Sequence, residues 1–454
     1  MADYKAPLQE VSFVINDLLN FSQLNKIPEF SDATPDLVDA VITEAGKFAA
    51  DVFAPINRIG DIEHSKASNG EVITPKGFKE AYQFFVDNGW MSLAQDPNFG
   101  GQGLPFTVHM TTSEFWNSAN TAMALCPMLT AGAIDVLSAH GSDELKRVYL
   151  EKLISGAWTG TMNLTESHAG SDLSNLKTKA TPNGDHYLIK GQKIFITWGE
   201  HDMAENIIHL VLAPMVDAAA GVKGLSLFVV PKYLVNQDGS LGERNDLKVV
   251  STEHKLGINA SPTCVMSFGE DQGAIGYLIG EPGQGLTCMF TLMNHARLEE
   301  GTTGIQANDL IGRKLVRDNG AGFQALMSEV DETLAVSSEQ HSKLVSGVVK
   351  AKADLEEAVA YILKNVTTSP KFEGAVATNF LMQIGYVIGA WYHLRSALIA
   401  QQKLDSGAGD SQFYQNKILG AKFYISQILP RASAHGTAII DGADVGCELS
   451  KKAF

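Results

Sequence analysis

The sequence contains few cysteines, and their spacing argues against the sites that depend on clustered thiols. Only four cysteines occur among the 454 residues, and Cys126, Cys264, Cys288 and Cys447 lie far apart. Zinc sites and disulfide frameworks need cysteines at short or recurring spacings. We therefore expect no metal site, and we interpret these residues as free or buried thiols of a protein from a reducing compartment.

The sequence also lacks a long apolar run and an excess of positive charge. No uninterrupted apolar stretch approaches the roughly 20 residues that cross a bilayer, so we expect no stable membrane insertion. The formal net charge of −16 argues against nucleic acids and anionic membranes as partners, because both attract basic surfaces. Residues 1–7 show neither a basic and apolar leader pattern nor an Arg-rich transit pattern, which predicts a cytoplasmic protein.

What the sequence does contain is an ordinary globular composition with two changes of hydrophobic period. Hydrophobic residues make up 45% and charged residues 19% of the chain, enough for two or three core-forming units. Helical spacing runs through residues 1–157, alternation with a period of two follows over residues 158–285, and helical spacing then continues to the end. This order predicts a multi-domain α+β protein with a β-barrel or β-sandwich between helical regions.

The first helical region offers one helix boundary and two segments with more than one interpretation. Thr34 and Pro35 are typical of a helix start, and Pro55 is predicted to end that helix. The glycine-rich residues 98–105 resemble a phosphate loop, but no strand precedes them and no Lys-Ser/Thr pair follows, so a tight turn is favoured. An apolar stripe either lines an acyl chain or, as such stripes more often do, belongs to the core: Met123, Leu125, Met128 and Leu129.

The stretch from residue 161 to residue 172 suggests a site at the end of a strand. A short apolar run stops there in hydroxyl and small residues, which leaves free backbone N–H groups and the hydroxyls of Thr165 and Ser171. Such a rim can hydrogen-bond a flat polar ring. An ordinary strand exit with a Ser/Asp turn uses the same residues, so the stretch alone leaves both interpretations open.

A second stretch follows after a predicted turn at residues 183–184. Residues 187–199 alternate as a strand does and carry an aromatic residue, Phe195, two positions before a hydroxyl residue, Thr197. Together, the two stretches resemble the flavin-contacting strands of the acyl-CoA dehydrogenase family.

The resemblance to acyl-CoA dehydrogenases continues in the same order through four further segments, residues 224–231, 253–258, 278–286 and 293–298. The chain looks closest to the larger branch of the family, which carries an extra C-terminal helical region and includes 3-methylmercaptopropionyl-CoA dehydrogenases. Each of these strings is weak alone, and the ordered set is specific. The resemblance implies an N-terminal helical domain, a middle β domain and a C-terminal helical region.

The activity that the resemblance implies is the α,β-dehydrogenation of an acyl-CoA thioester with FAD. A base removes the α-proton, and the flavin accepts the β-hydrogen as hydride, because no side chain can accept a hydride. Residues 299–306 resemble the Glu-Gly-Thr motif that holds the base in this family, and its register selects Glu300 over Glu299. From the residues alone, Glu300 is one of many acids that precede a helix.

The other site residues are likewise carried over from the resemblance, position by position. It implies that seven residues contact the cofactor: Met162, Leu164, Thr165, Ser171, Phe195, Thr197 and Thr302. It implies that four residues contact the substrate: Ser171, Asn294, Arg297 and Gly301. The aromatic position is often tryptophan elsewhere in the superfamily, so stacking by Phe195 is expected to be weaker.

The sequence departs from the family between Leu298 and Glu299. The family places several bundle helices between these two motifs, and on the order of a hundred residues are missing here. They include the arginine and the glycine-rich segment that grip the pyrophosphate and adenine of FAD across the subunit interface. Residues 286–316 then correspond to a remnant of the bundle, and residues 317–454 to the C-terminal helical extension.

Three functions are therefore compatible with the sequence. The first is an acyl-CoA dehydrogenase of fatty acid β-oxidation, with an electron-transfer flavoprotein as electron acceptor and a homo-oligomeric, dimeric assembly. The second is a deletion variant without the FAD grip that binds acyl-CoA or a partner and does not catalyse. The third is an acyl-CoA oxidase, which passes electrons to oxygen and releases peroxide.

Overall fold

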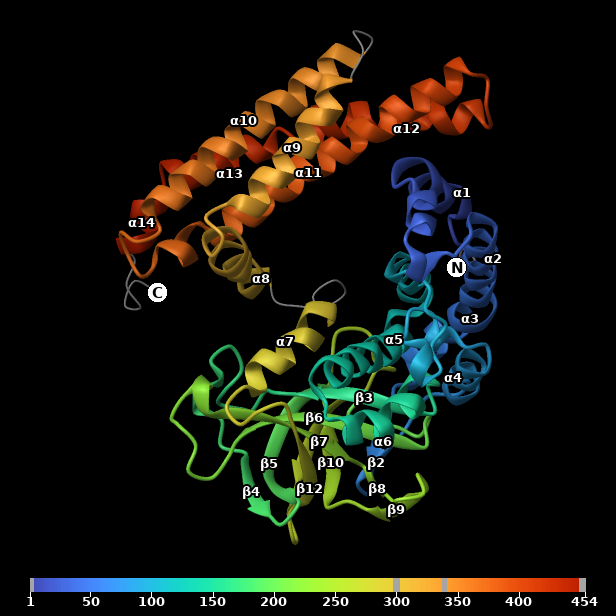
Figure 1. The fold of residues 1–454 in the computed structure, drawn as a ribbon, viewed down its shortest axis with the longest axis vertical. Coiled ribbons are helices and arrows are strands. Elements are labelled where there is room, and N and C mark those ends of the chain that lie inside the picture. The colour runs from blue at the N-terminus through green and yellow to red at the C-terminus, as the bar shows by residue number, and fades with distance from the viewer. Residues whose placement is uncertain (1–3, 297–302, 337–340, 449–454) are drawn as a thin grey trace. The chain divides into compact units, whose positions relative to one another are not determined.

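The computed structural model describes residues 4–296, 303–336 and 341–448 (Figure 1). It divides into two compact units, Met1–Glu300 and Gly301–Phe454, each with its own hydrophobic core. Helices, then strands, then helices follow one another along the chain, which confirms the predicted fold class.

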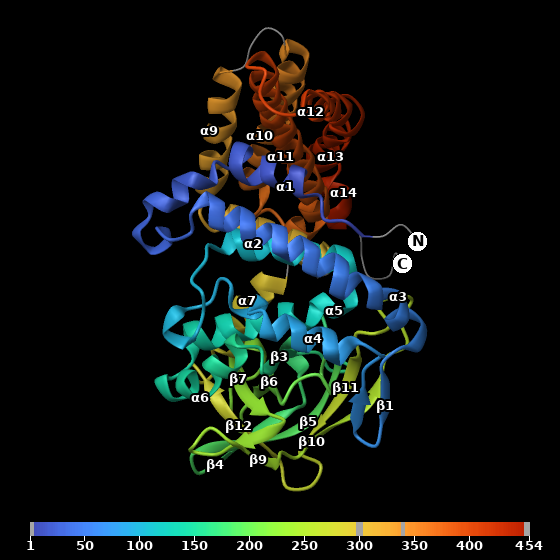
Figure 2. The same ribbon diagram turned by 90° about the vertical axis from the view of Figure 1, so that its right-hand side faces the viewer.

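Helices form the first part of unit 1. Their bounds are α1 Leu8–Ser12, α2 Pro35–Phe48, α3 Ala54–Glu63, α4 Phe78–Asp87, α5 Phe106–His140 and α6 Asp143–Ile154. The predicted start of α2 is confirmed, because the side chain of Thr34 accepts a hydrogen bond from the N–H of Leu37 at 3.4 Å. Figure 2 shows α2, α4 and α5 on the same side of the β-sheet.

The prediction that Pro55 ends this helix is wrong. The chain continues from α2 through a π-helical turn, Ala49–Phe53, directly into α3. Pro55 lies in the first turn of α3, a helix position that accommodates proline. The wider π-helical turn lets the chain restart its hydrogen bonding at the proline.

The glycine-rich segment is the tight turn that was favoured. Gly101 N–H donates to the carbonyl of Asp96 at 2.9 Å, and Gly103 N–H donates to the carbonyl of Gln95 at 3.1 Å. A Cβ atom on Gly101 would lie against the carbonyl oxygen of Gln95, so the fold requires glycine there. The segment closes on its own backbone before α5 begins.

A β-hairpin interrupts the N-terminal region that was predicted to be helical. Strands β1 (Lys66–Ser68) and β2 (Glu71–Ile73) are antiparallel. Asn69 and Gly70 join them with φ angles of 53° and 80°. Asn-Gly is the usual sequence of such a two-residue turn, so a local signal was present but the flanking strands are only three residues long.

The middle of unit 1 is a mixed sheet of eight strands. Its hydrogen-bonded order is β10-β11-β5-β12-β7-β6-β3, with β4 beside β5, and β3 and β6 form its parallel pair. The strands are β3 Trp158–Asn163, β4 Lys179–Asn183, β5 His186–Thr197, β6 Asn206–Pro214, β7 Leu225–Pro231, β10 Leu247–Thr252, β11 Thr263–Phe268 and β12 Ala274–Ile279. A second small pair consists of β8 Tyr233–Val235 and β9 Leu241–Arg244.

Helix α5 packs across the sheet at β3. A Cβ atom on Gly160 of β3 would lie 2.4 Å from the Cβ of Ala133 on α5, so the strand approaches the helix too closely for a side chain at this position. Met123, Leu125, Met128 and Leu129 are all buried in the core of unit 1. By length and composition, α5 alone among the described helices could cross a membrane, but most of it is buried inside the protein.

The remaining helices are α7 in unit 1 and seven α-helices in the described part of unit 2. Their bounds are α7 Gly285–Ala296, α8 Thr303–Asp309, α9 Ala321–Ala335, α10 Ser342–Asn365, α11 Phe372–Asp405, α12 Ser411–Phe423, α13 Arg431–Ile440 and α14 Ala443–Glu448. In unit 2, α11 is central and packs against α10, α12 and α13 (Figure 1).

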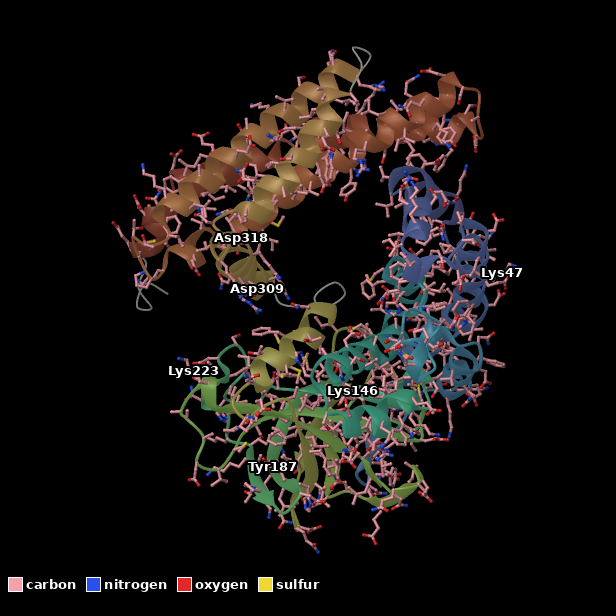
Figure 3. All side chains as sticks on the ribbon, in the orientation of Figure 1. Lys47, Lys146, Tyr187, Lys223, Asp309 and Asp318 are labelled. Atoms are coloured by element: carbon pink, nitrogen blue, oxygen red, sulfur yellow. The ribbon has the colours of Figure 1, made fainter. Side chains whose placement is uncertain are left out.

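Many charged side chains lie on the surface of each unit. Figure 3 labels several of them, and Lys47 on α2 points away from the fold, with 59% of its side chain exposed. Lys47 forms an exposed ion pair with Glu44, and such pairs contribute little to stability.

Candidate functional site

Strand β3 leads into the predicted rim, which carries the hydroxyls of Thr165 and Ser171. Polar side chains of the strand are buried behind this rim. Met162 is half-buried on β3, and Leu164, just past its end, is 8% exposed. Gly160 faces α5, and alternate residues face the other side of the strand. On that side Thr161 shares a buried hydrogen bond of 2.8 Å with His209 of β6. The rim therefore ends a strand that is fixed on both faces.

Phe195 occupies a β-bulge on β5. The pairing with β11 shifts register here, because Ile196 pairs with Cys264 while Lys193 pairs with Met266. Phe195 has a φ angle of 60°, which is uncommon for a residue with a side chain, and its ring is 57% exposed. Strained backbone that presents an exposed aromatic ring is a feature of binding sites.

The bulge joins the two predicted stretches through the backbone. Ile194 N–H, next to Phe195, donates to the carbonyl of Thr165 at 2.9 Å. At the other end of the bulge, Thr197 lies opposite Thr263 of β11. The structure thus brings Leu164 and Thr165 beside the bulge residues, although they are about thirty residues apart in the sequence.

Ser171 lies in the loop that follows β3. The main chain of Glu166 pairs with that of Ala169 in both directions, at 2.9 and 3.0 Å, which turns the chain back on itself. A Cβ atom on Gly170 would lie 3.6 Å from the side chain of Thr165. The turn therefore brings Gly170 beside Thr165, and the exposed Ser171 is the next residue in the chain.

A buried ion pair that the sequence analysis missed lies behind the rim. Lys193 Nζ lies 3.0 Å from Glu166 Oε1, and the two side chains are 0% and 4% exposed. Burial lowers the pKa of Lys193 to about 8, partly opposed by the charge of Glu166. Burial acts to raise the pKa of Glu166, but Lys193 and hydrogen bonds to the carboxylate hold it below its usual value.

Two buried histidines are a second feature that was missed. His209 and His201 are almost completely buried, and His201 Nε2 lies 2.9 Å from Thr159 Oγ1 of β3. Burial lowers the pKa of each imidazole to about 3, so both are neutral near pH 7. A histidine within the otherwise apolar strand β6 was the available signal.

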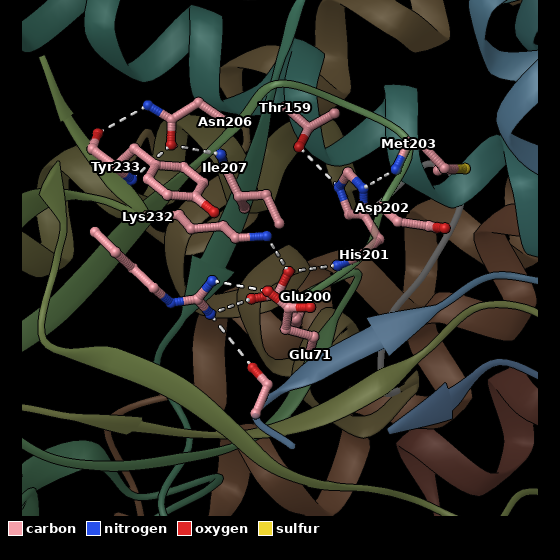
Figure 4. A network of polar contacts seen from close by, with 12 residues as sticks. Glu71, Thr159, Glu200, His201, Asp202, Met203, Asn206, Ile207, Lys232 and Tyr233 are labelled. Atoms are coloured by element: carbon pink, nitrogen blue, oxygen red, sulfur yellow. Dashed lines mark hydrogen bonds and ion pairs between the residues drawn. The ribbon is translucent and has the colours of Figure 1, made fainter. Parts of the chain in front are cut away.

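A buried polar network continues from the segment that follows Thr197 (Figure 4). Glu200 is its centre: its carboxylate lies 2.5 Å from Lys232 Nζ and 3.3 Å from Arg244. Arg244 also reaches Glu71 of the β1–β2 hairpin at 3.3 Å. Burial raises the pKa of Glu200, although both cations oppose this shift. The network anchors the chain beyond the bulge to the rest of unit 1.

The substrate residues implied by the resemblance are placed only in part. Asn294 is exposed on α7. The remaining predicted positions lie outside the described residues: Arg297, Glu300, Gly301 and Thr302. Within the part of the chain that the structure describes, no group of three His, Cys, Asp or Glu side chains could hold a metal ion.

The rim fits a flat polar ring better than an ordinary strand exit. Phe195 is exposed, and the residues predicted with it include three that carry hydroxyls, Thr165, Thr197 and Ser171. An ordinary exit has no reason to keep a phenylalanine at positive φ with its ring exposed. The arrangement can therefore stack against a ring and hydrogen-bond its edge.

Family models match the chain in three consecutive ranges. The model for the acyl-CoA dehydrogenase N-terminal domain matches residues 39–157, and that for the acyl-CoA dehydrogenase middle domain matches residues 161–270. The model described as acetyl-CoA dehydrogenase C-terminal like matches residues 326–450.

Named relatives agree with these matches. A 3-methylmercaptopropionyl-CoA dehydrogenase from Ruegeria pomeroyi is 33% identical over 97% of this chain and 98% of its own length. That alignment runs over 583 positions, more than the 454 residues of this chain, so part of the relative has no counterpart here. A butyryl-CoA dehydrogenase from Syntrophomonas wolfei is 37% identical over 66% of this chain, which spans only 51% of that relative.

Solved structures give a likeness of fold alone. The apo form of Bd2924 matches with a TM-score of 0.50 at 19% identity, over 91% of this chain and 84% of that one.

Proposed function

This chain belongs to the acyl-CoA dehydrogenase family, and we propose that it catalyses the α,β-dehydrogenation of an acyl-CoA thioester with FAD. The family models and the named relatives support this activity, and they give no support to the non-catalytic or oxidase alternatives. In the structure, the observation that carries the proposal is the bond between Ile194 and Thr165, which unites the two predicted flavin-contacting stretches.

We propose that the rim holds the ring of FAD. Leu164, Thr165 and Met162 would contact its edge from β3, with Ser171 from the following loop. Phe195 and Thr197 would flank it from β5, and Thr302 is proposed from the sequence. When bound, FAD supplies the acceptor for the hydrogen that leaves the β-carbon. The positive φ and exposure of Phe195 support its place against the ring.

We propose that the carboxylate of Glu300 removes the α-proton of the substrate. The α-proton of a thioester is weakly acidic, so the carbonyl oxygen must be polarised by hydrogen-bond donors, of which the N–H of Glu300 is one. Gly301 is proposed as a substrate contact next to the base, as the resemblance implies. Arg297 and Asn294 would bind polar parts of the substrate, and Arg297 would supply the local positive charge that this acidic chain needs.

The proposal extends to partners and place in the cell. An electron-transfer flavoprotein would reoxidise the cofactor, as the resemblance implies, and the protein would act in the cytoplasm in fatty acid β-oxidation. We propose a homodimer or larger homo-oligomer, as the resemblance implies. We also propose that the domains of the chain end at residues 157, 285 and 316.

The test is product formation with a panel of acyl-CoA thioesters and an artificial electron acceptor. We expect the enoyl-CoA product from the chain reconstituted with FAD. A Glu300→Gln variant should lower the rate by about 10²- to 10⁴-fold, the usual contribution of a general base. Glu299→Gln is the matched control and should retain most activity. Equal losses in both variants, or peroxide formed in step with product, would contradict the proposal.

A further inference from the structure

We propose that the buried ion pair of Lys193 and Glu166 positions the flavin rim, by holding Leu164 and Thr165 against the bulge at Phe195. This inference rests on the proposed function, because the rim is the proposed cofactor site. It assigns these two residues a positioning role, since neither is proposed to touch the cofactor.

The lysine connects the two strands that form the rim. Lys193 Nζ donates to the carbonyl of Leu164 at 2.8 Å and to Glu166 Oε1 at 3.0 Å. Lys193 belongs to β5, two residues before Phe195, whereas Leu164 follows directly on β3. A single ammonium group therefore fixes the end of β3 to the strand that carries the exposed ring.

The glutamate closes the loop on the other side. Glu166 Oε2 accepts from Lys177 N–H at 2.8 Å, and its Oε1 accepts from Thr178 N–H at 3.0 Å. These bonds hold the returning chain, just before β4, beneath the turn from Glu166 to Ala169. The loop that carries Ser171 is thus closed at its base by one carboxylate.

Stability alone does not explain such a pair. Taking two charges out of water costs about as much as their attraction returns, so apolar side chains of similar size would fold as well. The pair also has directional hydrogen bonds, which apolar side chains lack: it bonds three backbone groups on two separate segments, the carbonyl of Leu164 and the consecutive N–H groups of Lys177 and Thr178. Fixed geometry of this kind lowers the cost of ordering a site when its ligand binds.

The charges around the pair predict a pH dependence of cofactor binding. Glu166 faces Lys193 from the loop, and His168 Nε2 lies 3.6 Å from the same carboxylate. The pKa of Lys193 is about 8, so above that pH the ammonium loses its charge and its attraction to Glu166 weakens. We expect FAD affinity to fall as pH rises through about 8 in the wild type and to stay flat there in Lys193→Met.

The experiment compares FAD affinity with stability in three variants. Lys193→Met leaves Glu166 unpaired, and the double variant Lys193→Met with Glu166→Gln removes both charges. We expect roughly 10- to 100-fold weaker FAD binding in both, as for the loss of charged hydrogen bonds. The double variant should regain the thermal midpoint that the single variant loses, because no buried charge is left unpaired. The matched control is Lys232→Met with Glu200→Gln, another buried pair, which should bind FAD within about twofold of wild type.

Hydrogen exchange of the chain without cofactor separates this inference from the proposed function. In the wild type, the N–H groups of Ile194, Lys177 and Thr178 should be protected, and in the double variant they should exchange faster. FAD binding in the double variant within twofold of wild type, or unchanged exchange at these three amides, would overturn the inference. If the wild type binds no FAD at all, the proposed function fails, and the exchange result alone decides whether the pair fixes the rim.

Discussion

At the scale of single residues, the site depends on side chains whose environment is unusual for their type. Phe195 keeps an exposed ring on a backbone at positive φ. Lys193 is fully buried with a charge. His201 and His209 are buried and neutral. Each of these has a free-energy cost in folding, which indicates that the surrounding strands determine their positions.

Replacing Phe195 with alanine should weaken FAD binding without unfolding the protein. Its ring is 57% exposed, so its removal changes little in the core, whereas stacking on an aromatic ring contributes about 0.5–1.5 kcal/mol. We expect about 2- to 10-fold weaker FAD binding, measured by fluorescence titration. Phe84→Ala is the matched control, because that ring is also 57% exposed but lies on α4. Equal effects of the two variants would exclude a specific role for Phe195.

The buried histidines predict a loss of stability in acid. Each has a pKa of about 3 in the folded chain, against an ordinary value of 6.5. Between these values the unfolded chain binds more protons, so the free energy of unfolding falls as pH drops, by up to about 1.4 kcal/mol per pH unit for each histidine. Denaturant unfolding from pH 7 to pH 4 measures this slope. It should become shallower in His209→Gln and not in the control His254→Gln, whose side chain is exposed; identical slopes would contradict the assignment.

At the scale of elements, the contact between β3 and α5 sets the position of the rim. The backbone of β3 approaches α5 closely at Gly160 and Ala133. The same strand ends in Leu164 and Thr165. Any shift of β3 away from the helix would therefore move the rim relative to the bulge on β5.

Adding one methyl group at this contact should destabilise unit 1. In Gly160→Ala the new Cβ would lie 2.4 Å from Ala133, so the strand or the helix must move, at a cost of about 1–3 kcal/mol. Gly374→Ala on α11 is the control, because nothing lies within 4 Å of its added Cβ and alanine favours a helix by about 0.5–1 kcal/mol. Thermal unfolding should show opposite signs for the two variants. A stable Gly160→Ala protein would show that the contact is loose.

Elements with strong local signals were predictable from the sequence, and those set by tertiary contacts were not. The start of α2 follows from Thr34 and its side-chain cap, and the change to strands follows from the period of two. Pro55 was misread, because a proline that ends one helix and a proline in the first turn of the next look alike. The Lys193 pair was invisible, since only the fold brings Glu166 beneath β5.

In the site, too, the residues were predictable but the contacts between them were not. The joined rim was expected from the family resemblance, which gave Leu164, Thr165 and Phe195 but no geometry. The bulge that turns Ile194 N–H toward Thr165 depends on the pairing of β5 with β11, which no local pattern encodes.

At the scale of the whole molecule, the two units have separate hydrophobic cores. The core of unit 1 includes Phe53, Met128 and Leu210, and that of unit 2 includes Leu355 and Trp391. Units with separate cores can unfold independently. The described residues of the rim, which we propose to bind the flavin, belong to unit 1.

A core substitution in unit 2 should therefore leave cofactor binding intact. Leu355 is fully buried, and Leu355→Ala should destabilise its unit by about 2–5 kcal/mol. FAD affinity should stay within about twofold of wild type, because the rim residues lie elsewhere. Leu210→Ala, fully buried in unit 1, should instead weaken both stability and binding. Denaturant unfolding followed by circular dichroism and by flavin fluorescence measures both effects. A parallel loss of FAD binding in Leu355→Ala would show that the two cores are coupled.

The most direct test of an FAD-dependent acyl-CoA dehydrogenase is the absorbance spectrum of the purified chain with FAD under anaerobic conditions. A flavin band that persists after gel filtration and bleaches when an acyl-CoA thioester is added is the result we predict, with no bleaching in Glu300→Gln. A chain that loses all flavin on the column, or one whose flavin band is unchanged by every acyl-CoA tested, would contradict the proposed activity.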